Sequence, residues 1–263
     1  MNRQDNLEPI VDPTVEPKLD KETERSQGAI RRIDAARSLA LLDEPKALTT
    51  RELQDRRVIH RNDSVREQAD AFRELRTRLL AAGGERNFIT LVAPISHGCG
   101  GSFVARNLAA AFAFDDTKTA LLIDCDVLHP SQHTALRVDM AGGGLMDYLD
   151  DSSLDVSKIL YRTGVPRLRL VPSGRQRETT GESFSSFRMR AMIDSVRSRY
   201  ADRYIILDSP SVLGSPDARI LSELADMVVL VAGYGLVTPD KIEAALASFP
   251  SEKLAGVVFN HLP

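Results

Sequence analysis

A glycine-rich turn that ends in a hydroxyl residue is the clearest chemical feature of this sequence. The stretch "HGCGGS", His97 to Ser102, follows an apolar run and opens onto a helix-like pattern, which is the setting of a phosphate-binding loop. Glycine amides in such a turn can hold a phosphate, and a hydroxyl at the start of the helix can bind Mg²⁺. We therefore predict a nucleotide-binding loop made of Gly98, Gly100, Gly101 and Ser102.

Three acidic residues follow two apolar runs elsewhere in the chain. "ALLID" ends in Asp124, with Asp126 two residues further on, and "YIILD" ends in Asp208. Mg²⁺ keeps several waters and needs only one or two protein oxygens besides those of a phosphate. Together with Ser102, these strand ends predict a magnesium site, with Ser102 as a direct ligand. The alternative is that the acids only terminate buried strands.

The elements that must position these residues alternate between strands and helices. Six short, unalternating runs rich in Val, Ile and Leu indicate strands that are buried on both faces: "FITLV", "ALLID", "LRLV", "YIILD", "MVVLVA" and "AGVVF". Helical segments separate most of them, and Ser215-Pro216 and Thr238-Pro239 are typical helix starts. The pattern predicts an α/β domain over residues 63–263, with a doubly wound, mostly parallel sheet and ligands at the carboxyl ends of its strands.

The first part of the chain has a different composition. Residues 1–28 contain seven acidic and four basic residues, three prolines and few large apolar groups, so they have little surface to bury. Helical fragments follow around "RSLALLDEP" and after Thr49, where Thr49 and Glu52 have the spacing of a capping box. We predict that residues 1–62 are a mostly disordered, flexible segment or linker.

Composition excludes some functional classes. The chain has 34 Lys and Arg against 37 Asp and Glu, a formal net charge of -3, which argues against a general nucleic-acid binder. No apolar run approaches the roughly 20 residues that span a bilayer, so we expect no transmembrane segment and a cytoplasmic location unless a partner holds the protein at a membrane. Two cysteines, Cys99 and Cys125, cannot form a disulfide framework, and we expect unreactive thiols.

The order of these motifs resembles that of the bacterial tyrosine kinases (BY-kinases) of capsule and exopolysaccharide synthesis, in the deviant P-loop ATPase superfamily. The resemblance runs from about Asp63 to Asn260 and rests on "HGCGGSFVARNLA", "LLIDCDVLHP", "YIILDSPSVLGSPDARILSELADMVVLVA" and "GVVFN". That family has a phosphate loop, an Asp-x-Asp motif and an aspartate-ended motif followed by Ser/Thr-Pro. "GLMDYL" and "ESFSSFRM" are smaller similarities.

The resemblance implies a P-loop NTPase-like fold that uses ATP or ADP and Mg²⁺. By position, Asp124 and Asp126 would organise Mg²⁺ and the attacking group as catalytic residues, and Asp208 would hold a metal-bound water. Asn260 would contact adenine. Phe103 stands in the nucleotide loop where the exosortase-associated branch of the family also has phenylalanine.

A second similarity concerns assembly. "DAFRELR" resembles the family's E-x-x-R-x-x-R assembly motif, with Asp70, Arg73 and Arg76 in register. The spacing predicts that all three share one helix face, where a partner subunit can pair with them. The implied partners are further copies of the chain and a membrane polysaccharide co-polymerase of the chain-length determinant type or a related kinase, at the inner face of the cell membrane. The alternative is a solvated charged helix.

Two departures from the family pattern affect activity. Gly101 replaces the lysine of the phosphate loop, and the sequence ends at "FNHLP" without a tyrosine-rich tail, since all five tyrosines lie before residue 235. Arg106 is about 140° further round an ideal helix than Gly101, so we expect it to point away from the phosphates. We expect Gly101→Lys to tighten ATP binding if the loop keeps its shape.

These departures favour a regulatory, pseudokinase subunit with a weak nucleotide site. An active autokinase or ATPase of the same pathway remains the enzyme alternative. A positioning ATPase of the partition or septum-site kind is the third candidate, but it needs a lysine near the start of the loop, and "APISHGCGGS" contains none.

Overall fold

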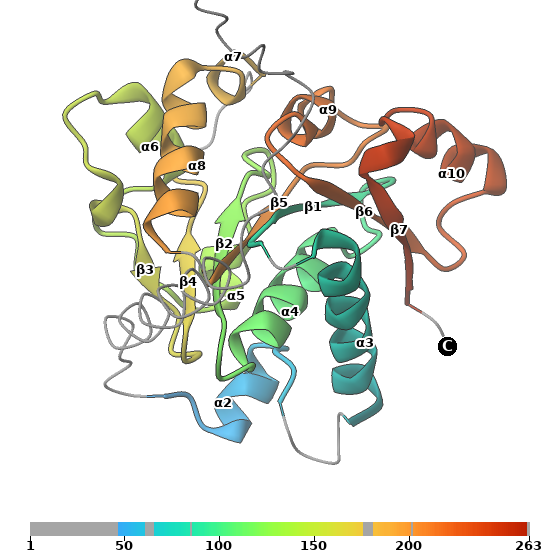
Figure 1. Ribbon diagram of the computed structural model, residues 1–263, viewed down its shortest axis with the longest axis horizontal. Helices are drawn as coiled ribbons and strands as arrows, with labels where there is room; N and C mark the ends of the chain where they lie inside the picture. The colour runs from blue at the N-terminus through green and yellow to red at the C-terminus, as the bar shows by residue number, and fades with distance from the viewer. Residues whose placement is uncertain (1–46, 61–65, 85, 176–180, 201, 262–263) are drawn as a thin grey trace, which may run out of the picture.

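A seven-stranded sheet forms the centre of the protein (Figure 1). The computed structural model describes residues 47–60, 66–84, 86–175, 181–200 and 202–261. The strand order is β3-β4-β2-β5-β1-β6-β7, and every neighbouring pair is parallel except β3 and β4. The strands are β1 (Ile89–Pro94), β2 (Thr119–Asp124), β3 (Tyr161–Arg162), β4 (Leu168–Val171), β5 (Arg203–Asp208), β6 (Met227–Gly233) and β7 (Leu254–Asn260).

Helices cover both faces of this sheet. The long helices α3 and α4 pack side by side on one face, and α8, α9 and α10 lie against the other (Figure 1). The helices are α2 (Thr50–Asp55), α3 (Arg66–Gly83), α4 (Gly101–Ala113), α5 (Gln132–Ala135), α6 (Leu145–Asp150), α7 (Gly181–Phe184), α8 (Phe187–Arg199), α9 (Asp217–Ser222) and α10 (Pro239–Leu246). Two single 3₁₀ turns occupy Val156–Lys158 and Ser251–Lys253.

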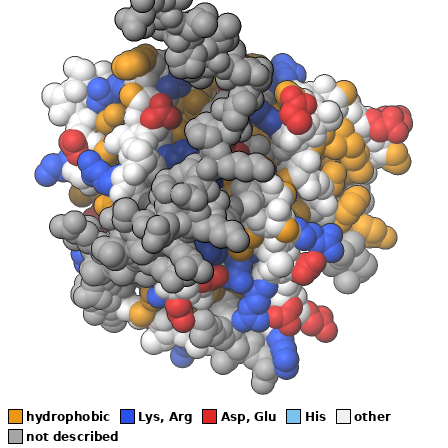
Figure 2. Space-filling view, viewed as in Figure 1, with side chains coloured by type: hydrophobic (Ala, Val, Ile, Leu, Met, Phe, Trp, Pro, Cys, Tyr) orange, Lys and Arg blue, Asp and Glu red, His pale blue; other side chains and the backbone are white. Residues whose placement is uncertain are grey.

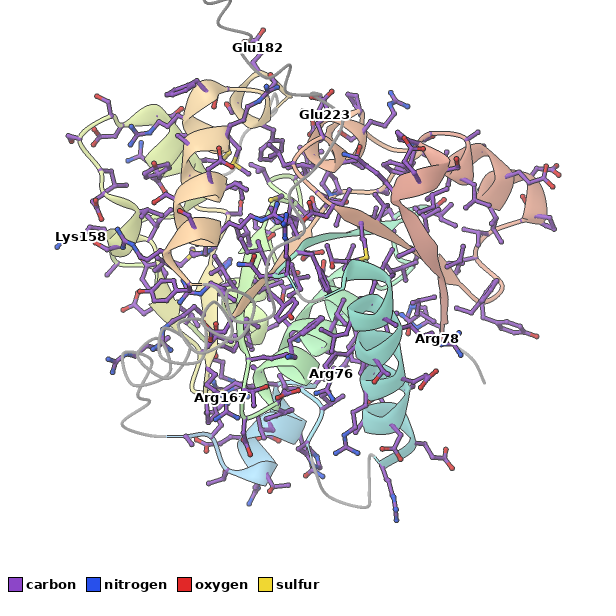
Figure 3. All side chains as sticks on the ribbon, viewed as in Figure 1. Arg76, Arg78, Lys158, Arg167, Glu182 and Glu223 are labelled. Atoms are coloured by element: carbon purple, nitrogen blue, oxygen red, sulfur yellow. The ribbon has the colours of Figure 1, made fainter. Side chains whose placement is uncertain are left out.

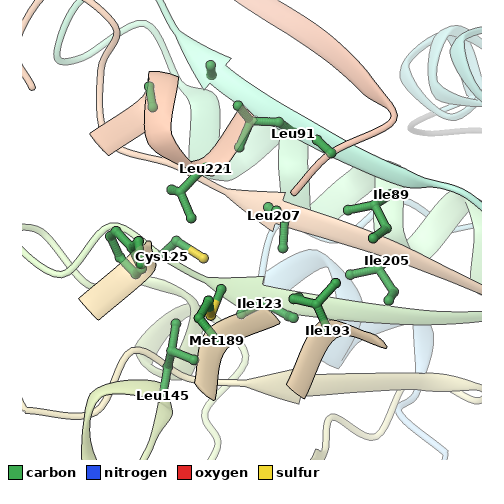
Figure 4. Packing of buried hydrophobic residues seen from close by; sticks show 14 of the residues in the cluster. Ile89, Leu91, Ile123, Cys125, Leu145, Met189, Ile193, Ile205, Leu207 and Leu221 are labelled. Carbon is green, nitrogen blue, oxygen red and sulfur yellow. The ribbon is translucent and has the colours of Figure 1, made fainter. Parts of the chain in front are cut away.

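The core lies in two layers, one on each face of the sheet. Every residue of β1, β2, β5 and β6 is buried, because alternate side chains point to opposite faces and both faces are covered. On one face, residues such as Leu91, Ile123 and Leu207 pack against Met189, Ile193 and Leu221 of the covering helices (Figure 4). The predicted doubly wound, mostly parallel α/β fold is therefore confirmed.

All six strands that the sequence indicates are present. The two-residue edge strand β3 was not predicted, because it is too short to show a pattern. Ser215 accepts a hydrogen bond from the backbone N–H of Asp217 at the start of α9 (3.1 Å), and Pro239 is the first residue of α10.

The folded unit begins earlier than the predicted boundary at residue 63. Thr49 and Glu52 form the expected capping box at the start of α2, but the segment also packs on the α/β unit. Leu53, Val58 and Ile59 are buried, and the Ile59 N–H donates to Asn107 Oδ1 on α4 (2.7 Å). The rest of the predicted segment, residues 1–46 with "RSLALLDEP", lies outside the described residues.

One edge of the sheet is exposed. Strand β7 has solvent on its outer side, and hydrophobic side chains gather where β7 and α10 lie (Figure 2). Tyr234, Leu236 and Phe259 are each more than half exposed there, at 59, 51 and 55%. Within the described residues, no helix combines the length and the apolar character that crossing a membrane requires.

Candidate nucleotide site

The predicted phosphate loop connects β1 to α4 and depends on its glycines. Gly98 and Gly100 have φ values of 85° and 83°, a left-handed conformation that side chains other than glycine rarely adopt. Gly100 also has no room for a Cβ, which would lie 2.1 Å from Asn260 Nδ2. Asn260 comes from the end of β7 and donates to the Cys99 carbonyl (3.0 Å). Asn260, which the resemblance predicts to contact adenine, therefore stabilises the conformation of the phosphate loop.

Gly101 is constrained by a neighbour rather than by its backbone. A Cβ at this position would lie 2.6 Å from Cδ and 2.7 Å from Cγ of Pro94, at the end of β1. A proline ring is rigid, so a larger residue here must displace the end of a buried central strand. The loop is thus packed for glycine where phosphate loops have lysine, and our expectation that Gly101→Lys tightens ATP binding does not fit this geometry.

Asp124 and Asp208 lie side by side at the ends of adjacent strands. They are register partners in the β2–β5 pair, and both side chains are fully buried. Burial raises the pKa of Asp208 to about 7. Burial and the negative charge of Asp208 also raise the pKa of Asp124 well above its usual range, although the backbone N–H groups of Ser131 and Gln132 donate to its Oδ2.

Gln132 connects this acid pair to the phosphate loop, and sequence reasoning missed it. The side chain is fully buried. Its Nε2 donates to Asp208 Oδ2 (2.6 Å) and to the Ser102 carbonyl (2.8 Å), and its Oε1 accepts from Arg106 Nη1 (3.2 Å). The sequence holds only a weak signal, a polar residue eight positions after Asp124, because the burial of Gln132 comes from packing between distant segments.

The carboxylates and the loop hydroxyl fit Mg²⁺. Oδ1 of Asp124 and Oδ1 of Asp208 are buried and accept no hydrogen bond within the described residues, and the Ser102 hydroxyl hydrogen-bonds Asp208. Unpartnered carboxylate oxygens beside a hydroxyl are ligands that this ion prefers. The described residues contain no cluster of three or more His, Cys, Asp and Glu side chains that would hold a metal by itself. The arrangement therefore suits an ion that takes its other ligands from phosphate and water.

Asp126 occupies a different place from the acid pair. It lies beyond the end of β2 on the wall of the cleft described below, and its Oδ1 accepts from the His129 N–H (3.0 Å). The His97 and His129 rings are 4.6 Å apart at the same wall. Asp126 is thus more accessible than Asp124.

A cleft of about 1130 Å³ lies above these residues. It is bounded by the loop, α3, the start of α4 and the end of β7, and it is large enough for a nucleotide. Phe103 contributes its ring, which meets the Phe72 ring of α3 edge to face at 6.0 Å. The cleft brings together the predicted nucleotide-binding residues Gly98, Gly100, Gly101, Ser102, Phe103 and Asn260.

Arg106 also lines this cleft, although the helical-wheel argument directs it away from the phosphates. Long side chains on a helix lean toward its N-terminus, so the surface they cover lies over the preceding turn. The Arg106 guanidinium lies 5.9 Å from the ring centre of Phe103, one turn earlier. A helical wheel treats a side chain as a radial spoke and misses this lean.

The three predicted assembly residues do not share one role. Asp70 and Arg73 form an ion pair on the exposed side of α3. Arg76 instead donates to the Ala111 carbonyl of α4 (2.8 Å) and lies 3.9 Å from Asp115. Figure 3 shows Arg76 on the side of α3 that faces α4 and Arg78 on the outer side. Arg76 is therefore less exposed, at 20% of its side chain, than Asp70 and Arg73 at 53 and 45%.

Both cysteines are buried and unpaired. Burial is the main cause that raises the pKa of the Cys125 thiol well above its usual range, and the nearby aspartates add to it. A thiol that stays protonated is a poor nucleophile, in line with the expectation of unreactive thiols.

Comparison with known proteins identifies the relatives of this chain. No family model matches it. It is 29% identical over 196 residues to the tyrosine-protein kinase Wzc of Salmonella typhimurium, and 32% identical over 197 residues to the putative tyrosine-protein kinase EpsB of Ralstonia solanacearum. The tyrosine-protein kinase CpsD of Streptococcus agalactiae is 29% identical over 191 residues. The chain is a relative of the bacterial tyrosine-protein kinases.

These matches cover different shares of the relatives. They cover 72 to 73% of this chain. They cover only 27% of Wzc and 26% of EpsB, but 81% of CpsD. The chain therefore spans about a quarter of the length of the first two and about four-fifths of the third.

Solved structures show the same fold. The kinase domain of Escherichia coli tyrosine kinase ETK superposes with a TM-score of 0.70 at 23% identity, over 84% of either chain. A plasmid partition protein from Borrelia burgdorferi gives 0.50 at 16% identity, over 66% of this chain and 78% of that one. This chain thus has the fold of tyrosine-kinase domains, and its fold is less similar to that of the partition protein.

Proposed function

We propose that this chain is a kinase-like regulatory subunit of bacterial capsule or exopolysaccharide synthesis and export, with a weak nucleotide site. The observation that supports this proposal is the packing of Gly101 against Pro94, which leaves no room for the lysine that phosphate loops have at this position. A charge-assisted hydrogen bond contributes about 1.5 to 3 kcal/mol. Without it, nucleotide affinity falls by roughly tenfold to a few hundredfold.

Binding still has support from the rest of the loop. The backbone amides around Gly98 and Gly100 and the N-terminus of α4 favour a phosphate. Ser102, Asp124 and Asp208 would hold Mg²⁺, directly or through water, and the ion would supply positive charge to the phosphates. The proposed ligands are therefore ATP or ADP with Mg²⁺.

Turnover is harder to sustain than binding. Charge that develops on a transferred phosphoryl group needs preorganised cations, and removal of one donor typically slows a reaction by about 10² to 10³. Asp124 and Asp126 would act as catalytic groups only if turnover occurs. We therefore assign the nucleotide a regulatory or architectural role.

The proposed partners follow from the relation to tyrosine-protein kinases and from the exposed Asp70–Arg73 pair. They are further copies of the chain, and a membrane polysaccharide co-polymerase or a related kinase. Such contacts would hold the protein at the cytoplasmic face of the cell membrane.

An active autokinase is the second candidate. The adjacent Asp124 and Asp208 and the Arg106 side chain in the cleft favour it, because carboxylates that can hold Mg²⁺ and a cation beside the phosphates are groups that phosphoryl transfer uses. A positioning ATPase has weaker support, since the likeness to a partition protein concerns the fold alone.

Assays on the full chain separate these candidates. We expect micromolar or weaker ATP affinity by calorimetry, and ATP hydrolysis and phosphotyrosine formation no higher than in the matched Ser102→Ala variant. CpsD, assayed in parallel, supplies the rate of a kinase. A parent rate comparable to that of CpsD, abolished by Asp208→Ala, would replace the regulatory proposal with the enzyme.

A further inference from the structure

Arg106 is a buried cation that forms no ion pair among the described residues. The residue is 6% exposed, and the charge of Asp208 acts on it only from beyond ion-pair distance. Nη1 donates to Gln132 Oε1 (3.2 Å), and the buried Nε has no hydrogen-bond partner. Burial is the main cause that lowers the pKa of Arg106. Because an unpaired buried guanidinium is costly, its place in the fold requires a reason.

The cleft supplies a reason, since Arg106 lines it together with Gly101 and Ser102. Gln132 connects Arg106 to the loop and to the acid pair. Its side chain accepts a hydrogen bond from Arg106 and donates to the Ser102 carbonyl and to Asp208. Arg57 adds an exposed second cation to the same cleft, and its charge also lowers the pKa of Arg106. The cleft also contains the carboxylates of Glu67 and Asp126, but Arg57 and Arg106 place two cations beside the glycine loop, where a phosphate would bind.

We propose that Arg106 binds the phosphate chain of the nucleotide, in place of the lysine that is absent at position 101. Gln132 acts as its positioning residue and holds the guanidinium in register with Ser102 and Asp208. A guanidinium presents several N–H donors in one plane, which matches phosphate oxygens. This inference rests on the proposed nucleotide site and assigns it a binding residue.

A purely structural role predicts something different. If Arg106 only offsets the negative charge of Asp208, its loss should change stability and leave anion binding unaltered. If it binds phosphate, its loss should weaken every ligand that carries a phosphate chain. Inorganic pyrophosphate therefore tests the residue without any contribution from adenine.

The test compares Arg106→Gln, Arg106→Lys and the control Arg78→Gln in the full chain. Arg78 pairs with Glu74 on the outer side of α3, so the control makes the same charge change outside the cleft. Calorimetry should show ATP and pyrophosphate binding weakened about tenfold to a hundredfold in Arg106→Gln. Arg106→Lys should recover most of this loss, and Arg78→Gln should match the parent.

A second measurement covers the case in which Arg106→Gln fails to fold. In the parent, pyrophosphate should shift the Nε–H resonance of Arg106 in a nitrogen-15 spectrum, assigned by its absence from Arg106→Lys. Unchanged affinities in a folded Arg106→Gln, or an unmoved resonance at saturating pyrophosphate, would overturn the inference.

The outcomes also separate this inference from the proposed function. ATP binding that is insensitive to Arg106 removes the inference alone. Pyrophosphate binding that depends on Arg106, without ATP binding, removes the nucleotide proposal and keeps the anion-binding residue. Binding of neither ligand by the parent removes both.

Discussion

At the scale of single residues, Gly101 shows how one contact can change a site. The Pro94 ring lies so close to position 101 that a Cβ there would overlap it. The substitution that would restore the motif must therefore also alter the strand below it.

This packing predicts the result of Gly101→Lys. The new Cβ overlaps the Pro94 ring, and overpacking a buried site typically costs about 1 to 3 kcal/mol. The variant should melt below the parent and bind ATP no more tightly in calorimetry. Pro94→Ala with Gly101→Lys removes Cγ and Cδ of the ring and should recover part of the melting temperature. A stable single variant with tighter ATP binding would show that the loop accommodates lysine after all.

Asp208 gives a prediction that depends on pH. Its folded pKa of about 7 exceeds the ordinary value of 3.8, so the unfolded chain releases this proton first. The side chain therefore opposes folding increasingly from about pH 4 to pH 7, by up to about 4 kcal/mol. Asp208→Asn removes this opposition, and it should raise the melting temperature at pH 8 much more than at pH 4.5.

Asp115 provides the control of opposite sign. Burial opposes its charge, but the hydrogen bonds from Thr117 and the charges of Lys118 and Arg76 together lower its pKa. Asp115→Asn should therefore lose stability at pH 8 and little at low pH.

Asp208→Asn should also lose Mg²⁺-dependent nucleotide binding. Equal shifts at both pH values for Asp208→Asn would contradict the assigned pKa.

At the scale of elements, one side of helix α3 contacts α4 and the other side is exposed. Arg76 satisfies the Ala111 carbonyl near the end of α4, whereas Arg73 forms an ion pair with Asp70 on the exposed side. Arg76→Ala should lower stability by about 1 to 3 kcal/mol, because it leaves a carbonyl without its charged donor. Arg73→Ala should instead preserve the melting temperature and reduce the sedimentation mass of the protein or its co-purification with a membrane partner.

The matched control is Arg78→Ala on the same helix. Arg78 is exposed and pairs with Glu74, so its loss should change neither property. If Arg73→Ala assembles, binds and supports polymer synthesis like the parent, the Asp70–Arg73 pair is only a solvated surface. An intact melting temperature in Arg76→Ala would show that its contact with α4 contributes little.

The elements were more predictable from the sequence than the contacts between them. Continuous apolar runs such as "YIILD" and "MVVLVA" indicate strands directly, because burial on both faces removes the polar alternation. The acid pair and the glycine loop could also be predicted, since strand ends and turns have local sequence signatures. The sequence did not predict the contacts of Gln132, Arg106 and Arg76, because these depend on the direction in which a side chain leans or on a partner from a distant segment.

At the scale of the whole molecule, the start of the folded unit is set by tertiary contacts. Residues 48–60 show no sustained apolar period, yet the Leu48 N–H donates to the Gly164 carbonyl (2.9 Å). Arg56 donates to the carbonyls of Leu136 and Thr163 (2.9 and 3.3 Å). The segment thus joins α4 to the region around β3 and β4, and it brings Arg57 to the cleft.

These contacts predict that a chain that starts at residue 63, where the sequence pattern changes, is less stable than the full chain. Its truncation removes the buried Leu53, Val58 and Ile59 and leaves the Asn107 side chain on α4 without the Ile59 N–H. In the full chain, Ile59→Ala should alone cost about 2 to 4 kcal/mol, measured by urea unfolding, and the exposed Gln54→Ala should cost almost nothing. The truncated chain should unfold at lower urea than Ile59→Ala, because it loses the whole contact surface. It should also bind pyrophosphate more weakly, because Arg57 is lost. If the truncated chain unfolded at the same urea concentration as the full chain, residues 48–60 would be an accessory segment and the domain would begin where the sequence pattern indicates.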